Sequence, residues 1–144
     1  MASSRKNPQQ SEPQEYSTTH AEVESFEQIA SHMNALHQEF AVQAKSKPDN
    51  VINKFKVKML NEKLALANSL LAGSFKPFAD FTAFNDVDLP SNSDVALVLN
   101  TYLASLERWR SARVFFRDWK WYWRTTAGPL LGAESPTMYT PKEK

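Results

Sequence analysis

The fold depends on the structure of residues 92–124, which read NSDVALVLNTYLASLERWRSARVFFRDWKWYWR. The first half of this stretch has apolar side chains three and four positions apart, at Val95, Leu99, Tyr102, Leu106 and Trp109. This spacing is typical of one face of an α-helix. No glycine or proline occurs in the stretch, and the next is Gly128-Pro129. We therefore expect one helix of about 33 residues, roughly 50 Å long, with Ser91 as its cap and Asp94 in its first turn.

The second half of the stretch also permits a β-strand. Aromatic and non-aromatic side chains partly alternate at Trp119–Trp123, and alternation is the signal of a strand. We nevertheless expect helix here, because no second strand is available to pair with this one.

Two further helices are expected upstream. The first begins at Thr19, where Thr19-His20-Ala21-Glu22 matches a capping box. Its apolar stripe is formed by Phe26, Ile29, Met33, Leu36 and Phe40. The second begins near Ser46-Lys47-Pro48-Asp49 and ends before Gly73. Its apolar positions are Ile52, Phe55, Met59, Leu60, Leu64, Ala67, Leu70 and Leu71.

Four phenylalanines follow at intervals of three residues, namely Phe75, Phe78, Phe81 and Phe84. Pro77 could open a short connector helix that extends to Phe84 and places the rings on one side. Such a helix would serve as a lid on the open end of a helical bundle. The alternative is that the four rings line a ligand pocket or a peptide groove.

The fold class expected from these patterns is all-α. Three long helices and the short aromatic connector helix would form an up-down bundle over residues 19–124. Residues 1–18 and 125–144 contain few large apolar side chains and several prolines. We expect the first segment to be a disordered N-terminal tail and the second a flexible C-terminal tail.

The composition excludes several classes of protein. There is no cysteine, so neither a disulfide framework nor a thiolate zinc site can form. The formal net charge of +1 gives no whole-chain attraction to nucleic acid or membrane. His32 and His37 are five positions apart and would not share a helix face as metal ligands. No catalytic constellation, phosphate loop or dinucleotide motif occurs, so we expect no enzyme, metal, cofactor or identifiable small-molecule substrate.

The unusual segment of the chain is Arg108–Arg124, which holds all four tryptophans and six basic residues against Asp118 alone. On a helix, one cationic stripe would form from Arg110, Arg113, Arg117, Lys120 and Arg124. The aromatic side chains available to a partner would be Trp109, Phe116, Trp119, Trp121, Tyr122 and Trp123.

Three interpretations of this segment remain open. Its rings could be core with a solvated arginine rim, its Trp and Arg residues could form a protein interface, or its arginines could follow the phosphates of a nucleic acid. A membrane-surface helix has a similar composition but is less favoured.

The function predicted from the sequence is a non-catalytic protein–protein interaction module, a small subunit or adaptor that binds a protein partner or a second copy of itself. The alternative is a nucleic-acid-binding protein that coats a strand by self-association and uses the basic stripe Arg110–Arg124. The absence of cysteine and of an apolar run after Arg5 and Lys6 predicts a cytoplasmic or nuclear location.

Overall fold

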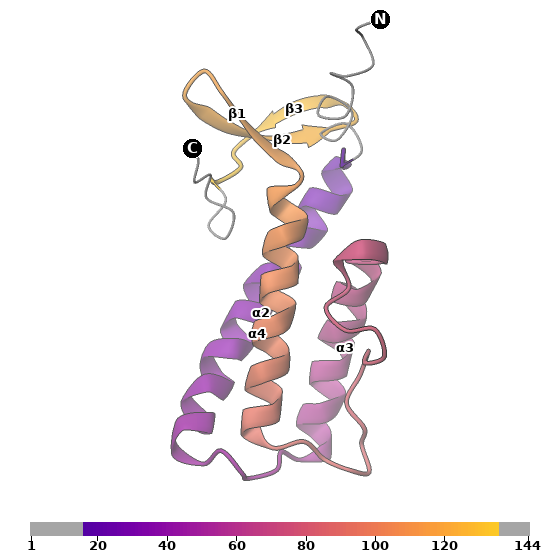
Figure 1. Cartoon of the computed structure of the whole chain (residues 1–144), viewed down its shortest axis with the longest axis vertical. Helices are drawn as coiled ribbons and strands as arrows, with labels where there is room; N and C mark the ends of the chain where they lie inside the picture. The colour runs from indigo at the N-terminus through magenta and orange to yellow at the C-terminus, as the bar shows by residue number, and fades with distance from the viewer. Residues whose placement is uncertain (1–15, 136–144) are drawn as a thin grey trace, which may run out of the picture. The chain divides into compact units, whose positions relative to one another are not determined.

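The computed structural model describes residues 16–135 (Figure 1). Its elements are the helices α2 (His20–Ser46), α3 (Lys54–Leu70) and α4 (Asn92–Ser111), the 3₁₀ turn η1 (Gly73–Phe75), and the strands β1 (Val114–Arg117), β2 (Lys120–Thr125) and β3 (Gly128–Leu131). The strands form one antiparallel sheet in the order β1-β2-β3. The all-α prediction is therefore wrong, because the chain beyond Ser111 turns into a sheet rather than continuing α4 to Arg124.

The chain divides into two compact units. The helical unit is Ser25–Leu106, and the sheet unit comprises the described residues up to Glu24 together with the described residues from Glu107 onward. The segments expected to be tails contribute to the sheet unit where they are described. Thr18 bridges to Thr125 in a parallel sense, and β3 lies within the expected C-terminal tail. Residues 1–15 and 136–144 of those tails lie outside the described residues.

Reciprocal side-chain caps begin two of the helices where the sequence indicates. At the start of α2, the Thr19 hydroxyl accepts from the Glu22 amide at 3.1 Å and the Glu22 carboxylate accepts from the Thr19 amide at 3.0 Å. At the start of α4, Ser91 and Asp94 exchange the same pair of bonds at 3.1 and 3.3 Å. Each cap satisfies two amides that the helix itself leaves without acceptors.

The three helices lie alongside one another in the helical unit (Figure 1). Its buried apolar side chains are Phe26, Ile29, Met33, Phe40, Ile52, Val57, Leu60, Leu64, Ala67, Leu71, Phe84, Val95, Leu99, Tyr102 and Leu106. The apolar stripes predicted for α2 and α4 supply most of this core, since residues three and four apart share one helix face. No helix in the described residues is long and apolar enough to cross a membrane.

The start of α3 differs from the prediction. Its N-cap is Asn53, whose side chain accepts from the Lys56 amide at 2.9 Å, and not Ser46. Pro48 and Asp49 instead form a turn after the end of α2, and Ile52 donates its amide to the Pro90 carbonyl at 3.0 Å. With this later start, Val57 is buried whereas Phe55 and Met59 are exposed, so the stripe predicted for the second helix is wrong at those positions.

The connector between α3 and α4 does not form the predicted helix beyond Pro77, and it does not cap the end of a bundle. It returns along α3, which makes α3 and α4 run in the same direction (Figure 1). Three contacts mark this path in order. Asn68 donates to the Thr82 carbonyl at 3.0 Å, Asn61 binds Phe84, and Asn92 donates its amide to Asn50 at 2.8 Å.

The connector phenylalanines pack in sequence as edge-to-face pairs. Phe78 and Phe81 have ring centroids 5.4 Å apart, Phe81 and Phe84 are 5.1 Å apart, and Phe78 also approaches Tyr102 at 6.1 Å. Such pairs add stability beyond the area they bury. Phe84 is buried, and Phe75, Phe78 and Phe81 are partly buried. The Phe78–Tyr102 contact attaches the connector to α4, and the ligand pocket or peptide groove stays a prediction.

Replacing Asn61 with alanine is expected to lower the free energy of unfolding by about 1–3 kcal/mol. The Asn61 amide group donates to the Phe84 carbonyl at 2.9 Å and accepts from the Phe84 amide at 2.8 Å, and Phe84 is only 9% exposed. Urea denaturation measures the loss, and hydrogen exchange at the Phe84 amide measures the release of the connector. The exposed Asn34→Ala is the control, and unchanged protection at Phe84 in Asn61→Ala would contradict the role assigned to Asn61.

Candidate functional site

The aromatic and basic segment forms a β-hairpin. In the β1–β2 register Val114 lies opposite Trp123, Phe115 opposite Tyr122, Phe116 opposite Trp121 and Arg117 opposite Lys120. A two-residue turn joins the strands, with φ of 52° at Asp118 and 66° at Trp119. Positive φ at both central residues is the geometry that matches the twist of a tight hairpin. It is normally supplied by Asn-Gly or Asp-Gly, so a tryptophan there is strained.

Alternation along the strands sends the side chains to two faces of the sheet. One face carries Val114, Phe116, Trp121 and Trp123. This face is buried at its base and exposed toward the turn. At the base Trp123 packs on Trp109 with ring centroids 6.2 Å apart. Trp109 and Trp123 are 2% and 3% exposed, so these two predicted partner residues belong to the core of the sheet unit.

The exposed end of this face is an aromatic cluster that we call the aromatic tip, formed by Phe116, Trp119 and Trp121. Phe116 contacts Trp119 edge-on at 6.1 Å between centroids and Trp121 at 5.3 Å. Trp119 is 89% exposed and Phe116 is 50% exposed. Burying a large apolar side chain stabilises a fold by about 1.5–3 kcal/mol. Trp119 and Phe116 contribute little of this stabilisation, because they are largely exposed.

The opposite face of the hairpin is the basic face, formed by Phe115, Arg117, Lys120, Tyr122 and Arg124. Phe115 stacks on Tyr122 at 5.6 Å with an interplanar angle of 20°. The guanidinium carbons of Arg117 and Arg124 lie 5.0 and 5.5 Å from the centre of the Phe115 ring. A shallow pocket of about 370 Å³ adjoins them and is lined by Phe115, Arg117, Arg124, Thr125, Gly128 and Pro129.

The other two members of the predicted basic stripe have structural roles. Arg110 is 7% exposed, pairs with Glu107 at 2.6 Å and donates to the carbonyls of Glu134 and Ser135 at 2.6 and 3.0 Å. The Arg113 guanidinium lies 4.1 Å from the centre of one Trp109 ring. Burial lowers the pKa of Arg113, and the charge of Glu22 opposes that shift. The single helical stripe is therefore wrong, and its residues divide between the core and one face of a sheet.

Two further charged groups of the sheet unit have shifted pKa values. Partial burial lowers the pKa of Arg124, which donates to the Ala112 carbonyl at 2.9 Å. The pKa of Glu22 is lowered, mainly by the hydrogen bond that its carboxylate accepts from the Thr18 hydroxyl at 2.7 Å. Within residues 16–135, no group of three or more His, Asp and Glu side chains could hold a metal ion.

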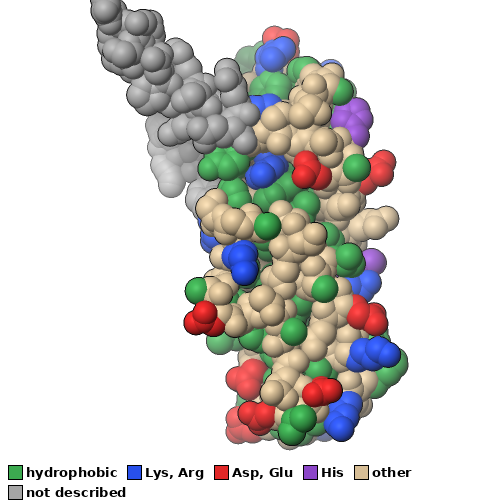
Figure 2. Space-filling model, turned by 90° about the vertical axis from the view of Figure 1, so that its right-hand side faces the viewer, with side chains coloured by type: hydrophobic (Ala, Val, Ile, Leu, Met, Phe, Trp, Pro, Cys, Tyr) green, Lys and Arg blue, Asp and Glu red, His purple; other side chains and the backbone are tan. Residues whose placement is uncertain are grey.

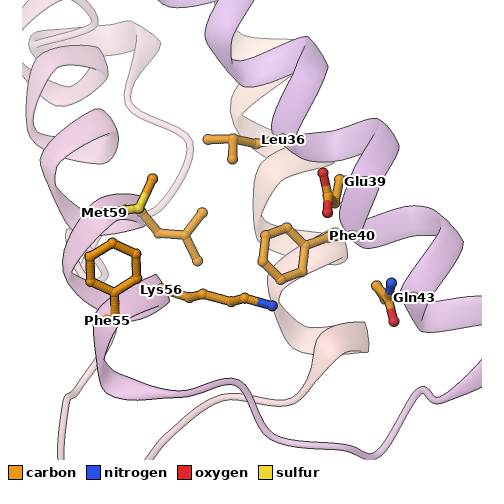
Figure 3. A pocket seen from close by; sticks show the side chains of 8 residues that line it. Leu36, Glu39, Phe40, Gln43, Phe55, Lys56 and Met59 are labelled. Carbon is orange, nitrogen blue, oxygen red and sulfur yellow. The ribbon is translucent and has the colours of Figure 1, made fainter.

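A second pocket, of about 210 Å³, lies between α2 and α3 in the helical unit (Figure 3). It is lined by Leu36, Glu39, Phe40, Gln43, Phe55, Lys56, Met59 and Leu60. Phe55, expected in the core, is 69% exposed at its edge. The charged residues that line this pocket are Glu39 from α2 and Lys56 from α3, and both lie beside apolar side chains (Figure 3).

Sequence reasoning missed the part of the site that comes from the expected C-terminal tail. Gly128 and Pro129 line the pocket on the basic face because β3 pairs with β2, where Arg124 lies opposite Pro129. The partial alternation at Trp119–Trp123 was the available signal. It would have placed Arg117, Lys120 and Arg124 on one face once a hairpin was assumed.

Replacing Trp119 with glycine is expected to give a protein about 1 kcal/mol more stable than replacing it with alanine. Both variants remove the ring and its contact with Phe116, so their difference isolates the backbone cost of a φ of 66°. Urea denaturation of the two variants measures it. Equal stabilities, or a more stable alanine variant, would show that the turn does not hold position 119 in the left-handed conformation.

Comparison of the chain with protein-family models, with curated proteins and with solved structures finds no match.

Proposed function

We propose that this protein is a protein-interaction subunit that docks a partner protein through the aromatic tip. The observation that carries the proposal is Trp119, a tryptophan that is 89% exposed in a turn whose backbone conformation disfavours it. An Asn or Gly would serve the turn better. Residues in strained conformations are often kept because function requires them. We propose that Trp119 is kept because it contacts a partner.

The composition of the tip supports a protein partner. Tryptophan and phenylalanine supply large contact areas at low cost in side-chain entropy, and Trp and Arg are enriched at binding hot spots. Phe116 contacts the Trp119 ring, and Trp121 in turn contacts Phe116. The three rings thus form a contiguous apolar patch at the end of a hairpin, the kind of exposed patch that marks an interaction site.

We propose further that the protein acts by binding rather than by catalysis, because its sequence contains no arrangement of nucleophile, base or cofactor motif. We also propose a cytoplasmic or nuclear location, since a chain without cysteine needs no oxidising compartment.

The nucleic-acid alternative has less support than the sequence suggested. It relied on five aligned cations, of which Arg110 and Arg113 are engaged within the sheet unit. The partner protein can also be a second copy of the chain. In that case the chain would self-associate, and the self-association would depend on Trp119.

Site-specific photo-crosslinking tests the proposal. A benzophenone amino acid at position 119 is expected to capture one defined protein in the cells that produce this chain. The matched control places the same group at Val87, which is 85% exposed in the helical unit. The captured protein is then purified and titrated with the wild type and with Trp119→Ala. We expect the alanine variant to bind about 30-fold more weakly, the effect of losing a hot-spot residue.

Three outcomes would contradict the proposal. One is the same set of adducts from positions 119 and 87, which would mean that the tip is only an exposed surface. Another is nucleic acid or lipid as the principal adduct at position 119. The third is unchanged affinity of Trp119→Ala for the captured protein.

A further inference from the structure

The basic face of the hairpin has three cations close together. Because Arg117 and Lys120 are opposite one another and Lys120 and Arg124 share one strand face, their positive charges are concentrated on a small area. Within residues 16–135 no carboxylate forms an ion pair with any of the three. Asp118 lies in the turn between Arg117 and Lys120 and is the one acid among residues 111–133.

The arginines of this face are held in place before any ligand arrives. Both guanidiniums lie within 5.5 Å of the centre of the Phe115 ring, and one nitrogen of Arg124 donates to the Ala112 carbonyl at 2.9 Å. A guanidinium has five N–H donors, so most of those on Arg124 stay available for an anionic oxygen. Less conformational entropy is lost on binding when side chains are already ordered.

We infer that the basic face binds an acidic, extended segment of the partner protein, through carboxylates placed on Arg117, Lys120 and Arg124. This inference rests on the proposed function, because it describes the chemistry of the same partner. From Lys120 to Arg124 the strand spans about 13 Å at roughly 3.3 Å per residue. An extended segment of about five residues with an Asp or Glu toward each end matches that span, and charge-assisted hydrogen bonds to arginine would fix it.

Two observations favour an acidic peptide over a nucleic acid. The Phe115 ring is already covered by Tyr122 and by two guanidiniums, which leaves it a poor stacking platform for a base. A nucleic-acid surface also needs a wide field of positive charge. On the face drawn in Figure 2, acidic and basic side chains are interspersed, and the chain as a whole carries only +1.

The test is a fluorescence-anisotropy titration of the full chain with a short labelled oligoglutamate, compared with an oligothymidine of the same length. We expect the oligoglutamate to bind the wild type and to be released at high salt. Arg117→Ala with Lys120→Ala should weaken its binding at least about tenfold. The matched control is Lys54→Ala with Lys58→Ala, which removes the same charge from exposed positions of α3 and should change the affinity less than about twofold.

The inference would be overturned if oligoglutamate failed to bind, if oligothymidine bound more tightly, or if both double variants weakened binding equally. Circular dichroism of each variant confirms that the fold is intact. Failure of the proposed function appears in the crosslinking at position 119, whereas failure of this inference appears in the titration.

Discussion

Replacing Trp109 with alanine should lower the free energy of unfolding by about 3–5 kcal/mol, the range observed for buried tryptophan and phenylalanine. Trp109 is 2% exposed and packs on Trp123, while the Arg113 guanidinium lies 4.1 Å from one of its rings. Removing the indole leaves a cavity beneath β2 and takes away the surface on which Arg113 rests. Guanidinium denaturation followed by near-ultraviolet circular dichroism measures the change.

Trp119→Ala is the matched control, since it removes the same side chain from a position that is 89% exposed. Its stability should stay within about 1 kcal/mol of the wild type, the size of the ring contact that it loses. The two variants should therefore separate stability from binding. If the proposed function is right, we expect Trp109→Ala to weaken partner binding because its sheet unfolds, and Trp119→Ala to weaken it with the sheet intact. Similar losses of stability in both variants would contradict the assignment of Trp109 to the core.

Replacing Leu64 with alanine should lower the free energy of unfolding by about 2–5 kcal/mol. Leu64 is fully buried in α3, where a deleted isobutyl group leaves an unfilled cavity among the three helices. Urea denaturation monitored by far-ultraviolet circular dichroism measures this loss.

Leu66→Ala provides the control for Leu64, because Leu66 lies two residues away in the same helix and is 52% exposed. Its effect should lie within about 0.5 kcal/mol of zero, since alanine is at least as good a helix former as leucine. A difference between the two variants below about 1 kcal/mol would mean that α3 packs through another face.

Local signals with a single physical meaning allowed much of α2 and α4 to be predicted. The Thr19–Glu22 and Ser91–Asp94 boxes each form both of their reciprocal hydrogen bonds. The spacing of the apolar residues correctly identified the buried faces of α2 and α4. The signal at Ser46–Asp49 was misleading because Asn53 is the residue that caps α3. The residues between Asp49 and Asn53 instead form hydrogen bonds with the end of the connector and the start of α4.

The hairpin could not be predicted from the same reasoning. Side chains at 110, 113, 117, 120 and 124 fit a helical period, yet those at 117, 120 and 124 also fall on one face of a hairpin with a two-residue turn. Asp118-Trp119 lacks the glycine that marks such a turn, and Pro129 in β3 argues against a strand. The sequence therefore identified the candidate site by its unusual content of aromatic and basic residues. Only the structure showed that the rings and the cations lie on two different faces of the sheet.

The division of the chain sets an order for the synthesis of the parts that form the sheet unit. The sheet unit combines residues up to Glu24 with those after Glu107, so one part is synthesised well before the other. At a synthesis rate of about 5–20 residues per second, Thr125 is added several seconds or more after Thr18, its bridging partner. The helical unit is complete in sequence by Leu106, before any of the hairpin exists. Trp119 is therefore synthesised late, and a nascent chain interrupted after Leu106 contains the whole sequence of the helical unit without the aromatic tip.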